Sequence, residues 1–402
     1  MIEIFIFIIA GVILGIFSGL MPGIHLNTIS FFVAALAFQG DFNLVVLVVA
    51  MAVTHSFCDF IPSILLGASD NSDDCISTLP GHRMFLQGKA LQAVKLSCLG
   101  CLLGAVFSVI LSPVFVGFAF QILGILPTLI PFLLIAVLAL MVFSESSLRK
   151  KISAIAVILL AGFLGLTALS LASMQNSLLA LVSGFFAASS LIWSLKEKTV
   201  FVKQDDPEIV FEKNNSLLAG FFGSISGSLV ALLPSIGPSE AAFMLRKLIG
   251  KIKTESYLVL IGSISTANMV FSFFMLYYFN KTRTGAAAAV KQISAISQGQ
   301  FFLLIAVVLF VAGIAFLLSI QLAKKSVFFL RKINYSLLNS AVLTFLVLMV
   351  FAFSGFKGLL VFFTASSIGI LALSSGIKRS HSMAFLMFPT LSFYLTALIQ
   401  SF

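Results

Sequence analysis

The sequence predicts an all-α polytopic membrane protein made of two inverted repeats, each a proline-broken re-entrant helix hairpin followed by about five transmembrane helices. Composition predicts the membrane class, because 60% of the 402 residues are hydrophobic and 9% are charged, against roughly 45–50% and 25% in soluble domains. The apolar residues also form many runs near the length of about 20 residues that a bilayer-crossing helix needs. One soluble core could not bury this excess.

An internal repeat predicts the two halves. Residues 11–31 match residues 223–243 at a constant offset of 212 positions. Two glycines and the central proline of each copy coincide, namely Gly11, Gly15 and Pro22 with Gly223, Gly227 and Pro234. Such matches arise by chance less readily than matches between apolar residues. We therefore predict a first transmembrane repeat over residues 1–203 and a second, inverted one over residues 204–402.

Each repeat begins with an apolar helix that runs into a proline-containing break, at residues 21–25 in the first copy and 233–238 in the second. A short apolar stretch follows each break. Because each half is short for a full crossing, the pair predicts a re-entrant hairpin, whose irregular backbone is tolerated at membrane depth only where protein or a cavity satisfies it. The alternative is an ordinary helix kinked at its proline.

The remaining spans lie between short polar loops. They are predicted at 44–66, 96–122, 128–145, 152–173 and 177–194 in the first repeat, and at 257–279, 300–323, 334–353, 358–375 and 382–402 in the second. Lys and Arg concentrate in cytoplasmic loops, and the first 82 residues contain neither. We therefore expect a multi-pass protein of the cell membrane with both termini outside. Five crossings then separate the hairpins, so the second copy points the opposite way.

The two breaks predict an anion site. Inverted repeats with discontinuous helices near the midplane are typical of secondary transporters, in which half-helix N-termini face an anionic substrate. The candidate ligands at the breaks are Pro22, Gly23, His25, Asn27 and Thr28 in the first copy and Pro234, Ser235 and Ser239 in the second, together with Asn268, which aligns with Ser56. A capping role explains Asn27 or Thr28 equally well, and a packed histidine explains His25.

Lys281 and Arg283 lie on the face that this topology places outside. Because basic residues there oppose the positive-inside trend, they suggest a role in binding a carboxylate or phosphate. The alternatives are contact with lipid headgroups or an error in the topology.

His55 and Asp59 are four residues apart and share one face of a helix. Ionisable side chains within a span are costly unless they are used. We take both, with Glu240 after the second break, as candidates for coupling to Na⁺ or H⁺. Hydrogen bonding between His55 and Asp59, or an N-terminal helix charge at Glu240, would explain these residues without transport.

Other functional classes lack sequence support. The sequence contains no Walker A loop, no G-x-S-x-G elbow and no zinc signature, so we expect neither an enzyme nor an ATP-driven pump, and neither a cofactor nor a metal site. Cys98 and Cys101 form a C-x-x-C within an apolar helix, where small residues commonly pack between helices. No basic and aromatic module predicts nucleic-acid binding.

Five stretches resemble the large permease of the tripartite tricarboxylate transporters, the TctA-like family, and particularly its shorter archaeal branch. They are residues 19–27 (GLMPGIHLN), 61–68 (IPSILLGA), 79–83 (LPGHR), 265–268 (STAN) and 282–285 (TRTG). The resemblance covers nearly the whole chain. It implies a permease that moves organic anions such as carboxylates, driven by an ion gradient, often with a small membrane subunit and an extracytoplasmic binding protein.

Two alternatives remain open at this point. The proline-glycine hairpin also looks like that of membrane proteins that recycle polyprenyl-phosphate lipid carriers, for which the anion would be a lipid phosphate in a groove open to the bilayer. A membrane enzyme acting on lipid-linked substrates would instead use His55 with Asp59 as an acid-base pair. The substrate, the coupling ion, the partner subunits and the oligomeric state are not determined by the sequence.

Overall fold

The computed structural model describes residues 2–21, 26–36, 40–66, 75–171, 176–196, 203–204, 213–250, 252–330 and 335–400. Throughout these ranges the regular structure is helical, without a strand. The helices of the first half are α1 (Ile2–Leu20), α2 (Leu26–Leu36), α3 (Phe42–Cys58), α4 (Phe60–Leu66), α5 (Cys75–Leu86), α6 (Ala90–Ile122), α7 (Leu126–Phe143), α8 (Leu148–Ser170), α9 (Ser177–Val182), a π-helix (Ser183–Ala188) and α10 (Ser189–Lys196). Those of the second half are α11 (Lys213–Leu232), α12 (Pro238–Ile249), α13 (Thr254–Phe279), α14 (Gly285–Ile293), α15 (Gln298–Leu330), α16 (Tyr335–Ser374), a 3₁₀ helix (Arg379–Met383) and α17 (Ala384–Gln400).

Eleven helical segments of the described chain are long and apolar enough to cross a membrane. They include every span predicted from the sequence, with the predicted pair 334–353 and 358–375 joined in α16. That helix is interrupted at Gly355, whose φ of 62° and ψ of −161° are not helical. A glycine suits this point because a side chain is strained at positive φ. The structure thus has two helices there, as the sequence predicts, meeting at a kink.

The first helix of each hairpin is longer than expected. α1 has 19 residues and α11 has 20, which gives each a length of roughly 30 Å, enough for the hydrocarbon core. Only the second helices, α2 with 11 residues and α12 with 12, are too short. Both helices of each pair were predicted to be too short to cross the membrane. That prediction was wrong for the first helices, α1 and α11, because each apolar run continues to the break without an earlier residue that ends the helix.

The helix boundaries repeat as closely as the sequence does. α1 ends at residue 20 and α11 at 232, α2 begins at 26 and α12 at 238, and α3 begins at 42 and α13 at 254. Each pair differs by the same 212 positions. α6 and α15, which occupy corresponding places, both have 33 residues. The sequence repeat is therefore a repeat of helices.

Glycines set the packing of the first helices. A Cβ added at Gly15 would lie 2.6 Å from the Thr54 Cβ of α3, and one added at Gly227 would lie 2.6 Å from the Ala267 Cβ of α13. Only glycine allows this approach, as in other membrane helix pairs. Along α1 the contacts advance from residue 47 to residue 59 of the partner, and along α11 from 260 to 268. Each first helix therefore runs parallel to the third helix of its repeat.

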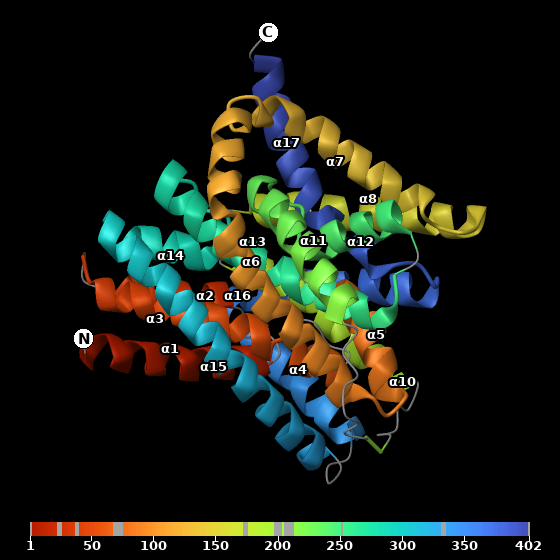
Figure 1. Ribbon diagram of the computed structural model, residues 1–402. Coiled ribbons are helices and arrows are strands. Elements are labelled where there is room, and N and C mark those ends of the chain that lie inside the picture. The colour runs from red at the N-terminus through yellow and green to blue at the C-terminus, as the bar shows by residue number, and fades with distance from the viewer. Residues whose placement is uncertain are drawn as a thin grey trace.

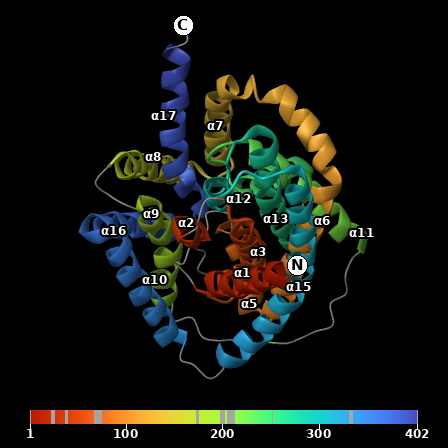
Figure 2. The same cartoon turned by 90° about the vertical axis from the view of Figure 1, so that its left-hand side faces the viewer.

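The long helices of the described chain form two bundles. The central bundle consists of α1, α3, α6, α11, α13 and α15, which pack on one another, and α3–α4 and α13 at its centre have 94% of their most apolar window buried. The side bundle consists of α7, α8, α9, α10, α16 and α17. Figure 2 shows α8, α9, α10 and α16 on one side, α3, α6, α13 and α15 on the other, and α2 between them.

Both bundles mix the two halves of the chain. In the central bundle α6 packs on α13, and in the side bundle α8 packs on α17. Figure 1 shows the corresponding colours interleaved, with the N-terminus at α1 and the C-terminus at the end of α17. The predicted division at residues 203 and 204 therefore does not coincide with the boundary between the two bundles.

The link between α13 and α14 returns into the molecule. Ser272 and Thr284 share a hydroxyl hydrogen bond of 2.9 Å, and Lys291 Nζ donates to the Asn280 carbonyl at 3.0 Å. Residues 281–284 therefore run back along the last two turns of α13, roughly 12 Å, before α14 turns and runs parallel to α13. This return carries Arg283 away from the helix end and into the molecule.

Candidate functional site: a cavity between the two bundles

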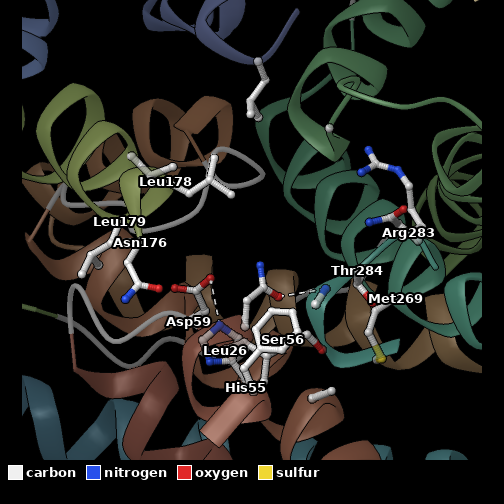
Figure 3. A pocket seen from close by; sticks show the side chains of 18 of the residues that line it. Leu26, His55, Ser56, Asp59, Asn176, Leu178, Leu179, Met269, Arg283 and Thr284 are labelled. Carbon is white, nitrogen blue, oxygen red and sulfur yellow. Dashed lines mark hydrogen bonds and ion pairs between the residues drawn. The ribbon is translucent and has the colours of Figure 1, made fainter. Parts of the chain in front are cut away.

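A cavity of about 760 Å³ lies between the central and side bundles. Its volume falls within the range of roughly 300–1,000 Å³ typical of small-molecule sites. The lining comes from α2, α3, α13, the α11–α12 break and the start of α14 on the central side, and from α8, α9, the 3₁₀ helix and α17 on the side bundle. Figure 3 shows side chains of both bundles facing this space.

Three helices begin at the cavity. Leu26 and Asn27 start α2, Gly237 precedes α12, and Thr284 and Gly285 start α14. A helix N-terminus carries about half a positive charge and presents N–H groups that lack intrahelical partners. Part of this capacity is used internally, because Asn27 Oδ1 accepts from Gly285 N at 3.1 Å. The arrangement nevertheless gives the cavity a positive backbone potential suited to an anion.

Arg283 is half-buried at the cavity wall. Its Nε donates to the Val230 carbonyl at 3.2 Å and its Nη2 to the Ile236 carbonyl at 2.7 Å. These carbonyls flank the break between α11 and α12, where Ser235 adopts a φ of +59°. The guanidinium therefore holds the broken backbone in place and brings a full positive charge to the cavity.

His55 and Asp59 also line the cavity, on the face of α3 (Figure 3). The Nδ1 of His55 lies 2.9 Å from Ser18 Oγ on α1, and its Nε2 lies 3.9 Å from Asp59 Oδ2. Ser18 Oγ also donates to the Gly15 carbonyl at 3.2 Å, so the imidazole is positioned by the end of α1. The exposed fractions of His55 and Asp59 are 4% each, which makes them a buried ionisable pair at an otherwise neutral part of the wall.

The crossing of α3 and α13 adds uncharged polar groups. Ser56 Oγ lies 3.4 Å from Thr266 Oγ1, which joins the two helices. Asn268, 5% exposed, lines the cavity, and its side-chain oxygen has no hydrogen-bond partner. A buried amide oxygen without a partner is costly, and a bound ligand or ion that supplied a partner would remove that cost.

The two walls differ in chemistry. Most of the polar lining belongs to the central bundle, whereas the side bundle supplies aliphatic residues together with Asn176 and Ser177. These aliphatic residues are Leu169, Leu178, Leu179, Val182, Met383 and Leu386. A ligand in the cavity would therefore meet charge and hydrogen bonds on one face and hydrocarbon on the other.

The structure brings together six of the residues predicted from the sequence. Asn27, His55, Asp59, Ser235, Asn268 and Arg283 all line the one cavity. Pro22, Gly23 and His25 lie outside the described residues, as does the side chain of Thr28. Lys281 is exposed and Pro234 lies in the break without lining the cavity.

Ser239 and Glu240 do not reach the cavity. Their exposed fractions are 0% and 1%. Glu240 Oε2 accepts from Gly237 N at 2.9 Å, which is the carboxylate half of a capping box. The structure thus places Glu240 in the first turn of α12, where the alternative considered for it, an N-terminal helix charge, would act.

Sequence reasoning missed several lining residues. Ser56, Asn176, Ser177, Ser265, Met269 and Thr284 line the cavity without having been predicted. Ser56 had a usable signal, since it aligns with Asn268 in the repeat. Asn176, which has a left-handed φ of 52° just before α9, had none, because its place depends on how the side bundle docks.

A second polar cluster lies where α12 meets the side bundle. Lys378 Nζ lies 4.5 Å from the Phe243 ring centroid of α12 and donates to Ser144 Oγ at 2.6 Å. His381 Nε2 lies 2.9 Å from Glu145 Oε1. Burial raises the pKa of Glu145, but hydrogen bonds from His381 and from Lys378 N outweigh it and hold that pKa below its ordinary value. The cluster therefore joins α12 to the side bundle.

His82 of α5 lies close to the side bundle. Its Nδ1 lies 2.9 Å from the Ile64 carbonyl. Burial lowers the pKa of His82, the hydrogen bond to Ile64 opposes this, and the nearby Arg379 guanidinium of the side bundle lowers the pKa further. The Ser235 and Thr390 hydroxyls share a hydrogen bond between the bundles.

Comparison with known proteins agrees with the resemblance seen in the motifs. The profile of the tripartite tricarboxylate transporter TctA family matches residues 5–384. The uncharacterized protein MJ1079 of Methanocaldococcus jannaschii is 30% identical over 408 residues, an alignment that covers 97% of this chain and 98% of the relative. No solved structure matches the chain.

Proposed function

Because the chain belongs to the TctA family of tripartite tricarboxylate transporters, a family of membrane transporter components, we propose that it is a secondary permease that moves an organic anion through the cavity between its two bundles. One observation carries the proposal: three helix N-termini and the Arg283 guanidinium meet at a single cavity of small-molecule size. Fixed backbone dipoles and one guanidinium can bind an anion without a large reorganisation of the protein.

We further propose that each proline break is the tip of a re-entrant hairpin. α1 runs parallel to α3 and ends beside Cys58 and Asp59, before α4 begins. To reach the start of α3, the chain must return through α2 toward the face where α1 began. The same reasoning applies to α11, α12 and α13, whose boundaries are shifted by 212 positions.

The two repeats are proposed to be inverted. α2 and α14 run parallel, because Asn27 bonds to Gly285 near the start of both and Gly40 N donates to the Ile293 carbonyl near their ends. α14 runs parallel to α13, and α2 runs opposite to α3. α3 and α13 are therefore antiparallel. This supports an inverted relation between the two repeats and the predicted five crossings between the hairpins.

Inversion supports an alternating-access mechanism. In the proposed state the α2 side of the site is open, since Asn27 lines the cavity, and the α12 side is closed, since the equivalent Ser239 is fully buried. Exchange of these two environments would present the anion to the other face of the membrane. The side bundle contacts both hairpins and is the element that would have to move.

Coupling to Na⁺ or H⁺ is assigned to the groups nearest the anion. His55 and Asp59 are ionisable, buried and cavity-lining, and Asn268 Oδ1 lacks a partner. A proton on His55 or a cation beside Asp59 would offset the charge of the anion. Glu240 is a weaker candidate because its carboxylate caps α12. The family description implies two further components, for which a small membrane subunit and an extracytoplasmic binding protein are proposed.

The proposed test is uptake of labelled organic acids into proteoliposomes containing the full chain, under an imposed Na⁺ or proton gradient. Arg283→Gln keeps the side-chain length and removes the charge, so we expect uptake to be lost while insertion persists. Lys281→Gln, an exposed neighbour in the same link, is the matched control and should transport normally. Normal uptake by Arg283→Gln, or no uptake of any acid by the unaltered chain, would contradict the proposal.

The lipid-carrier alternative has one observation in its favour. The aliphatic wall of the side bundle and the exposed rings of Phe31 and Phe32, which are 43% and 53% exposed, would suit a polyprenyl phosphate. Its test is flipping of a fluorescent prenyl phosphate between the leaflets of the same proteoliposomes. Flipping without uptake of any soluble acid would favour this alternative.

A further inference from the structure

The charge of the cavity limits the charge of its ligand. Among the described lining residues, Arg283 is the one Lys or Arg, and Asp59 carries the opposing carboxyl group. The first 82 residues of the sequence, which include α1, α2, α3 and α4, contain no Lys or Arg at all. A tricarboxylate in this cavity would therefore place three carboxylates near one guanidinium, and the carboxyl group of Asp59 is already present there. Burying unpaired charge is strongly unfavourable.

The aliphatic wall points to the rest of the ligand. The side-bundle lining given above consists of six aliphatic side chains, with Asn176 and Ser177 at its edge. Leu178 is the most accessible of the six, with 45% of its surface exposed, so a ligand in the cavity can contact it. A highly hydroxylated or multiply charged ligand would lose hydrogen bonds with water against this wall and regain none. An apolar body would instead gain from burial.

Resting on the proposed function, we infer that the ligand has a single acidic group and an apolar body: one carboxylate or phosphate group held by Arg283 and the starts of α2 and α14, and a hydrocarbon portion against Leu178, Leu179 and Leu386. This assignment differs from the tricarboxylate in the family description. A soluble acid is the occupant to which we commit, because a cavity of about 760 Å³ is of the size that encloses a small molecule.

Binding can be measured as the slowing of maleimide labelling, by a bound anion, of a cysteine placed in the cavity. Ser177→Cys lies beside the aliphatic wall and changes one atom of the side chain. The background replaces Cys58, Cys75, Cys98 and Cys101 by alanine. The full chain in lipid nanodiscs is labelled with a polar maleimide in the presence of acetate, butyrate, hexanoate, citrate or farnesyl phosphate, and the concentration that halves the labelling rate is measured for each.

We expect hexanoate to protect best among the soluble acids and citrate to protect poorly. Each methylene that reaches the wall should tighten protection by about fourfold. Arg283→Gln should weaken protection by every acid at least about tenfold, and Lys281→Gln should not. Leu178→Asn should remove part of the gain from chain length while leaving acetate unchanged, which a mere folding defect would not do.

The other outcomes are distinguishable. Protection by citrate at lower concentrations than hexanoate, abolished by Arg283→Gln, would overturn the inference and leave the proposed anion site standing. Protection by farnesyl phosphate alone would overturn the assignment to a soluble acid. Rapid labelling that no anion slows would overturn both the inference and the anion site.

Discussion

The helix pairs α1–α2 and α11–α12, proposed above as hairpins, have the same sequence pattern but differ in whether their second helix faces the cavity. Their first helices pack on α3 and α13 through glycines at equivalent positions, and a Cβ at Gly15 or Gly227 would meet its neighbour at the same 2.6 Å. Their second helices begin 212 positions apart. Yet Asn27 lines the cavity and its equivalent, Ser239, is 0% exposed.

Three contacts of the second hairpin account for this difference. Arg283 binds carbonyls on both sides of its break, Glu240 caps α12, and Lys378 of the side bundle lies over Phe243. At the first hairpin Phe32 meets Phe353 of α16 at 6.0 Å between ring centroids. The comparison teaches that a repeat can specify two equivalent helices while docking of the side bundle decides which of them faces the cavity.

The largest expected effect is in accessibility. In the background without native cysteines, Asn27→Cys should react with a polar maleimide faster than Ser239→Cys by on the order of tenfold or more, because a buried thiol reacts only through local opening. Labelling rates in nanodiscs measure this. Both variants should label fully after denaturation, which controls for reactivity. Equal rates in the native state would remove the asymmetry between the hairpins.

Next in size is the cost of a methyl group at the two glycine contacts. Gly15→Ala and Gly227→Ala should each lower the free energy of unfolding by about 1–3 kcal/mol, because both overpack a helix contact. Gly313→Ala, with no atom within 4 Å of the added Cβ, is the control and should cost nothing. Thermal denaturation in detergent measures the changes. A large effect in one repeat and none in the other would show that the two contacts are not equivalent.

Loss of the cation over Phe243 should have a smaller effect. Lys378→Met should weaken the contact between α12 and the side bundle by about 0.5–2 kcal/mol and raise the labelling rate of Ser239→Cys. Lys291→Met, which removes only an exposed bond to the Asn280 carbonyl, is the matched control. If Ser239→Cys labels no faster in the Lys378→Met variant, then the cluster at Lys378 does not keep this side closed.

The smallest expected effect is a pH dependence from His82. Its pKa in the folded protein is lowered, so the unfolded chain binds the proton more readily and the protein loses stability as the pH falls below about 6.5. His82→Asn should therefore show a smaller fall in Tm between pH 7 and pH 5.5 than the unaltered chain. An unchanged pH profile would mean that burial and the nearby Arg379 charge do not lower the pKa of His82 in the folded protein.

Local signals in the sequence predicted the helices well. The spans follow from the length of each apolar run, and the break at Ser235 follows from Pro234 and Pro238. The length of α1 was underestimated because a proline marks where a helix stops and says nothing about whether the preceding run already crosses the membrane. α14 was missed because its nine residues are far fewer than the roughly 20 of a membrane span, which was the signal used to find helices.

The candidate site was predicted only in part. His55, Asp59 and Asn268 could be found because ionisable or amide groups within apolar spans are unusual. Arg283 was predicted as an anion ligand, but on an outer surface, and the return of residues 281–284 along α13 places it at the cavity. The residues of α9 carried no signal, since a leucine against a ligand and a leucine against lipid look the same in sequence.

The sequence by itself determined the membrane class, the positions of most helices, the repeat and the two proline breaks, because apolar run length and the placement of glycine and proline act within a few residues of the chain. Only the tertiary structure decided the cavity. Asn27 meets Gly285, and Ser235 meets Thr390, across more than 150 positions of sequence. Such contacts depend on how whole helices pack, and hydrophobic pattern alone does not specify which faces meet across that distance.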